Sequence, residues 1–194
     1  MAAVWMQGNF MVMGNVLEQL RTMLTPVLAD QMGAVLRLNQ ATVKHGAEVV
    51  LPMLIGALAQ RSATASGALA VLELVGQASG ALLTQPVSYI DAFKADASDS
   101  LLDAIFGEGQ RAVFTSLQQA TGIDLQPLTA LLAPICVALL GKLVRAQQLG
   151  AAALADLLRR EACGAARLGS PAAVLAIGAL QAGDAQATLL AKKR

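Results

Sequence analysis

Apolar residues recur at three- and four-residue spacing along most of the chain, which is the pattern of helices rather than strands. The stretch 124–144, DLQPLTALLAPICVALLGKLV, is the strongest example, because small residues fill the side that its leucines leave open. A helix that is apolar on nearly every face is buried all round. We therefore expect a central buried helix, with Asp124 as its N-cap and a kink at Pro134.

The same stretch raises the question of a membrane span, which needs roughly 20 apolar residues. Its uncharged run, 125–141, is slightly short, contains Gln126 and Pro134, and ends against Lys142. These features favour the buried helix of a soluble protein. Membrane insertion or peripheral membrane contact remains the alternative.

The remaining periodicity predicts further helices, and the residues around 79–86 form the least helical stretch in the middle of the chain. The helices are expected over 15–24, 26–38, 41–60, 67–77, 86–93, 100–106, 108–121, 151–163 and 171–180. In the second, we expect an inward stripe of Val27, Leu28, Met32, Val35 and Leu36. In the fourth, we expect Leu69, Leu72 and Val75 to face inward. Because no alternating β-branched runs occur, the fold class expected is all-α, a compact multi-helical array of about eight to ten helices.

A weak internal repeat connects two parts of the chain. Pro52 and Pro134 each lie in the middle of an apolar run, and glycine follows at nearly equal distance, at Gly67 and Gly150. This pattern indicates two similar helical hairpins, each led by a proline-kinked buried helix. Chance similarity in a chain so rich in Ala and Leu is the competing explanation.

We divide the chain into three segments: an apolar, Met-rich N-terminal arm (1–14), a helical domain (15–164), and a C-terminal helix with a basic tail (165–194). The arm lacks the positive residues that begin a secretory signal. It is either a disordered terminus or a docking segment, in which Trp5, Phe10 and Met13 would contact a membrane or lipid.

Composition points to an apolar surface that something must cover. The chain is 56% hydrophobic and only 14% charged, against a usual charged share of about a quarter. Partners, further copies or lipid would hide such a surface. A net charge of +1 argues against nucleic-acid binding. The two cysteines, Cys136 and Cys163, lie in or beside apolar helix, so we expect both to be small core residues and not part of a disulfide framework. This use of cysteine fits a reducing compartment and a cytoplasmic location, with a position at the membrane periphery as the alternative.

No catalytic, cofactor-binding or metal-binding residue is predicted. His45 and Glu48 are one helical turn apart, but two ligands do not make a metal site. Cys136 lies in the most apolar part of the chain, where burial favours the inert thiol. Four acidic residues gather at Asp91, Asp96, Asp99 and Asp103. We interpret them as helix caps and a solvated loop, with a weak cation site as the alternative.

Three stretches, SLLDAIFGEGQ, VFTSLQQATGIDLQPLTALLAPICVALLGKL and ALADLLRRE, resemble the bacterial YidB-like family, domain of unknown function 937. The resemblance covers most of 27–161, and Gly107, Gly122 and the Ala133-Pro134 pair are its most specific positions. Asp99-Ser100 stands where the family often has Asp-Gly. The resemblance implies an all-helical bacterial protein, and it implies neither a reaction nor catalytic residues.

The sequence thus favours a non-enzymatic helical protein that forms homo-oligomers or acts as a scaffold for a protein partner. A membrane-associated or hydrophobic-ligand-binding protein is the alternative.

Overall fold

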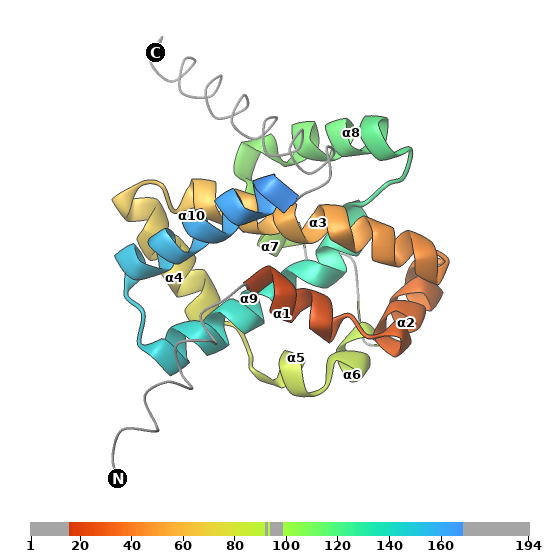
Figure 1. Ribbon diagram of the computed structural model, residues 1–194, viewed down its shortest axis with the longest axis horizontal. Helices are drawn as coiled ribbons and strands as arrows, with labels where there is room; N and C mark the ends of the chain where they lie inside the picture. The colour runs from red at the N-terminus through yellow and green to blue at the C-terminus, as the bar shows by residue number, and fades with distance from the viewer. Residues whose placement is uncertain (1–15, 92, 94–98, 169–194) are drawn as a thin grey trace.

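The structure is a computed structural model, which describes residues 16–91, 93 and 99–168 of the 194-residue chain. The regular structure of these residues is entirely helical, as predicted (Figure 1). In chain order the helices are α1 (Val16–Met23), α2 (Pro26–Leu36), α3 (Gln40–Arg61), α4 (Ala65–Gly76), α5 (Ala81–Thr84), α6 (Pro86–Asp91), α7 (Asp99–Phe106), the 3-10 turn η3 (Gly107–Gly109), α8 (Gln110–Thr121), α9 (Gln126–Gln147) and α10 (Ala151–Leu168). The predictions for the N-terminal arm, the start of the first helix at residue 15, and the helix over 171–180 fall outside the described residues.

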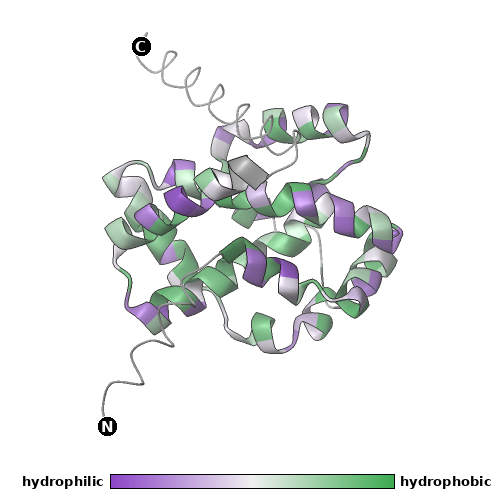
Figure 2. Cartoon of the chain, viewed as in Figure 1, coloured by the Kyte–Doolittle hydropathy of each residue, from purple (hydrophilic) through white to green (hydrophobic). Residues whose placement is uncertain are grey.

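Helix α9 is the central element, as the sequence predicts. It packs against α3, α4, α5 and α7. Its leucine stripe is buried, with Leu131, Ile135 and Leu139 each no more than 4% exposed. Figure 2 shows apolar colouring along most of α9 and polar colouring at its C-terminal end.

Two long helices, α3 and α9, are each followed along the chain by a shorter helix, α4 and α10 respectively. Both are 22 residues long and carry an interior proline, Pro52 in α3 and Pro134 in α9. Helix α3 packs against α9 and α10, and α4 packs against the same two helices. Each helix of the first pair therefore packs against each helix of the second pair. The two similar hairpins, and a kink at either proline, stay predictions.

By length and composition, α3 and α9 are also apolar enough to cross a membrane. In this fold, however, most of the apolar 18-residue segment of each helix is buried, 72% of it in α3 and 78% in α9. Core helices of soluble proteins have the same combination of length, apolarity and burial.

Local sequence explains most helix ends. The side chains of Thr25, Asn39 and Thr64 each accept a hydrogen bond from an amide in the first turn of the helix that follows. Gly107 and Gly122 adopt the left-handed conformation at φ values of 58° and 70°, which confirms the helix ends predicted there.

Three predicted boundaries were wrong. The stretch 79–86 contains the short helix α5, where Ser79 accepts a hydrogen bond from the amide of Ala81. Helix α10 continues through Gly164 to Leu168, because glycine weakens a helix without necessarily ending it. The N-cap of α9 is Leu125, although Asp124 does accept a hydrogen bond from the amide of Gln126 at 3.0 Å.

Three apolar side chains predicted to face inward lie on the surface instead. Val27 is 65% exposed, Val35 is 42% exposed, and Leu69 on α4 is 61% exposed. The rest of each predicted stripe is buried or partly buried. The apolar residues of α2 cover more than half of its circumference, so hydrophobicity alone could not decide which part of that arc meets the core.

Candidate functional site

Helix α2 carries an apolar surface that no described residue covers. At about 100° per residue, Val27, Ala34 and Val35 fall within roughly a third of a turn of one another. All three are exposed, and we call them the outer α2 face. Gln31, which falls between Val27 and Val35, is half-buried, and Leu28 and Met32, further round the helix beyond Val35, are buried. A surface helix normally places polar residues towards water, so this exposed apolar side indicates a contact surface.

Two opposite charges flank the outer α2 face. Asp30 and Arg37 are exposed and seven residues apart, about two turns and roughly 10 Å along the helix axis. Neither forms an ion pair with any residue in the described part of the chain. Arg37 ends the helix in the left-handed conformation, and its backbone amide donates to the carbonyl of Gly33.

The other exposed large apolar side chains lie elsewhere on the described surface. Val87 belongs to α6, which packs against α2, and it is 36% exposed. Leu69 stands on α4, between exposed alanine and glutamate residues. Only α2 presents more than one such side chain within the described residues, and it therefore offers the most extended apolar surface.

A polar pocket of about 560 Å³ lies where α7 turns back into α8. The reversal depends on Gly107, whose positive φ suits a residue without a side chain. Edge-on packing of the Phe106 and Phe114 rings, with centroids 5.5 Å apart, holds α7 against α8. The pocket is lined by Asp103, Gly107, Glu108, Gln110, Arg111, Phe114 and Gln126.

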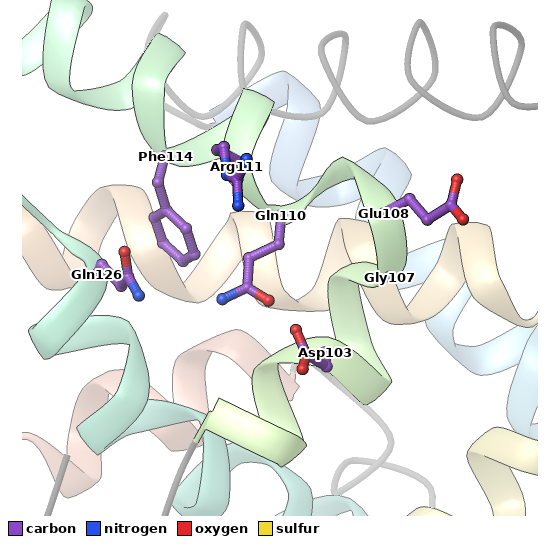
Figure 3. Close-up of a pocket in the computed structure, with 7 residues that line it drawn as sticks. All are labelled: Asp103, Gly107, Glu108, Gln110, Arg111, Phe114 and Gln126. Carbon is purple, nitrogen blue, oxygen red and sulfur yellow. The ribbon is translucent and has the colours of Figure 1, made fainter. Parts of the chain in front are cut away.

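Most of these side chains point into the pocket. Figure 3 shows Asp103, Gln110, Arg111, Phe114 and Gln126 turned towards a common space, whereas Glu108 points away from it. The Oε1 atom of Gln110 is buried and accepts no hydrogen bond from any residue that the structure describes. An acceptor left in this state costs free energy, which a ligand with a suitable donor would recover.

The residues considered for metal or acid–base chemistry are mostly apart from one another. His45 and Glu48 lie 4.0 Å apart on the open surface of α3, with side chains 64% and 66% exposed. Of the two environments that the sequence left open for His45, structural or solvent-facing, the structure has the solvent-facing one. Asp91, Asp99 and Asp103 are exposed, and Asp96 is outside the described residues. Within the described ranges, no three His, Cys, Asp or Glu residues lie close enough together to hold a metal ion.

The two cysteines differ in environment. Cys136 is fully buried in α9, and burial raises the pKa of its thiol from 9.0 to about 12. Cys163 is exposed on α10. The prediction of a buried core residue is therefore correct for Cys136 and wrong for Cys163, which lies on the outer side of its helix.

Sequence reasoning missed both surfaces described above. The outer α2 face left one signal, an apolar helix whose hydrophobic residues cover more than half of its circumference instead of gathering on one side. The pocket left no comparable signal, because its residues come from three helices and a turn.

Comparison with known proteins gives one match. The model of a bacterial protein family of unknown function, DUF937, matches residues 18–145, which run from α1 to near the end of α9 and include both surfaces. No curated protein and no solved structure matches the chain.

Proposed function

This chain belongs to the DUF937 family of bacterial proteins, and we propose that it is a non-enzymatic helical protein that binds a second copy of itself through the outer α2 face. The match confirms the family expected from the sequence, and it assigns no reaction. One observation carries the proposal: Val27 and Val35 are exposed on the same side of one helix.

Pairing of the α2 helices of two copies about a two-fold axis would cover the outer α2 face. Closed homodimers place the same patch of both copies against each other across a two-fold axis. If that axis lies perpendicular to α2 at the level of Gly33 and Ala34, the helices run antiparallel, and Val35 of each copy lies against Val35 of the other. In this register Asp30 of each copy faces Arg37 of its partner, and Val27 lies towards the end of the interface. The charge pattern is therefore self-complementary, which favours a second copy over an unrelated partner.

The expected affinity is modest. Burying the exposed parts of Val27 and Val35 would contribute roughly 1–2 kcal/mol per copy. Two partly exposed ion pairs would add about 1 kcal/mol or less each. Together these gains amount to at most about 6 kcal/mol before the loss of rotational and translational freedom, less than the roughly 8 kcal/mol of a micromolar complex, so we expect a weak dimer that dissociates in the millimolar range.

Sedimentation velocity across a dilution series that extends to about a millimolar tests the proposal. The wild-type chain should shift from monomer to dimer with rising concentration, and Val35→Glu should remain monomeric, because two buried carboxylates would face each other. Gln118→Glu is the matched control, since it adds the same charge to an exposed position near the C-terminal end of α8. Its dimerisation should equal that of the wild type. A wild-type chain that stays monomeric, or equal effects of the two variants, would remove the proposal.

Membrane association is the alternative function, and the length and apolarity of α3 and α9 support it. It requires these helices to leave the core, since most of each is buried. Flotation with liposomes distinguishes the two functions. Self-association predicts that the chain stays with the soluble fraction, and membrane association predicts that it floats. For location we propose the cytoplasm, where the unpaired thiols Cys136 and Cys163 would persist.

A further inference from the structure

The polar pocket between α7 and α8 has the dimensions of a small-molecule site. Its volume of about 560 Å³ lies within the range of roughly 300–1,000 Å³ common for such sites. It is lined by charged and amide side chains and one aromatic ring. The ligand must therefore be small and polar, with some carbon surface to contact Phe114.

One side of the pocket accepts hydrogen bonds. The carboxylate of Asp103 faces the open space, and the buried Oε1 of Gln110 lies beside it without a donor (Figure 3). An ammonium group has three donors and a positive charge, so it suits a carboxylate and a carbonyl oxygen together. The nearby ring of Phe114 can also attract a cation.

The other side of the pocket donates hydrogen bonds. Arg111 extends into the space from α8, and the amide of Gln126 enters from the first turn of α9 (Figure 3). A guanidinium group binds a carboxylate with two parallel hydrogen bonds, which is the geometry that fixes a small acid in one orientation. A ligand held here would carry a carboxylate.

These two halves exclude simpler ligands. An inorganic anion would meet Arg111 but would be repelled by Asp103, and a metal ion would find one carboxylate and a nearby positive charge. Since Glu108 points away, the two charges that face the space balance. From this balance we infer that the pocket binds a small zwitterion of the amino-acid class, with the ammonium group at Asp103 and Gln110 and the carboxylate at Arg111.

The inference is tested by NMR spectroscopy, in which each of the standard amino acids is titrated into the full-length, isotope-labelled chain. At least one should shift amide resonances of α7 and α8 in a saturable way. The corresponding amine without the carboxylate, and the corresponding acid without the amine, should bind about tenfold more weakly or worse. If no amino acid shifts these resonances at millimolar concentration, or if either truncated compound binds as well as the parent, the inference is wrong.

Substitutions locate the site. Asp103→Asn and Arg111→Gln should each weaken binding by about tenfold or more, because each removes one charge-assisted contact. The matched controls, Asp91→Asn on α6 and Arg160→Gln on α10, change exposed residues outside the pocket and should leave the affinity unchanged. Unaltered binding in Asp103→Asn or Arg111→Gln would contradict the assignment, provided that thermal melts show both variants folded. Val35→Glu should bind the amino acid normally, so this result is independent of self-association.

Discussion

A methyl group at Gly141 should force apart two helices that now touch. The Cβ atom of an alanine at this position in α9 would lie well inside 3.0 Å of the carbonyl oxygen of Val75, in α4. Real Cβ atoms essentially never approach another atom so closely. Because the obstacle is backbone, no side-chain rotation relieves it, and α4 must move away from α9.

The cost of Gly141→Ala follows from two opposing effects. Overpacking a well-packed core costs up to about 3 kcal/mol, and a clash with backbone belongs at the upper end. Alanine in place of glycine within a helix recovers about 1 kcal/mol. We therefore expect a net loss of roughly 2 kcal/mol, which for a chain of this size lowers the Tm by about 4–8 °C.

Gly164→Ala is the matched control, with the opposite sign. Gly164 lies within α10, and a Cβ there would meet no atom within 4 Å among the residues that the structure describes. Only the helix-propensity gain remains, so the Tm should rise by about 2–4 °C. Thermal unfolding followed by circular dichroism measures both variants. If the two substitutions shift the Tm in the same direction, the close approach of α4 and α9 at Gly141 is not real.

Two further predictions concern the central helix. Leu132 is 1% exposed, so the substitution Leu132→Asp should unfold the protein. An unpaired buried charge costs at least several kcal/mol, which is comparable with the whole free energy of unfolding of a domain. If the variant keeps the cooperative thermal melt of the wild type, Leu132 lies at the surface. Burial raises the pKa of Cys136 to about 12, so the unfolded thiol ionises from about pH 9 while the folded one stays neutral. Between pH 9 and 12, this thiol should therefore lower the free energy of unfolding by about 1.4 kcal/mol per pH unit. The variant Cys136→Ala should lack this contribution to the pH dependence of stability. Urea denaturation at a series of pH values measures the slope, and equal slopes in both proteins would refute the buried thiol.

The sequence predicted those parts of the fold that depend on local chemistry. The apolar residues of α9 leave it no side that prefers water, so its burial followed directly. Gly107 and Gly122 supply left-handed conformations, and Pro26 fits the first turn of α2, so these boundaries were also readable.

What the sequence could not decide depends on neighbours that are distant along the chain. Val35 and Met32 are equally suited to a core, and the positions of α3, α6 and α9 around α2 determine that Met32 is buried and Val35 exposed. Asp103 looked like one of several solvated acids until the turn at η3 brought Arg111 back towards it. Both surfaces proposed here arise from this kind of tertiary arrangement.

Reversal of the two charges beside the outer α2 face tests self-association most directly. Asp30→Arg alone would place arginine against Arg37 of the partner, and Arg37→Asp alone would place aspartate against Asp30. Each single variant should therefore dimerise more weakly than the wild type in sedimentation equilibrium. The double variant Asp30→Arg/Arg37→Asp restores opposite charges across the interface, and its dimerisation should recover to near the wild-type level. Single variants that dimerise as well as the wild type, or a double variant that stays as weak as the single ones, would contradict antiparallel pairing through α2.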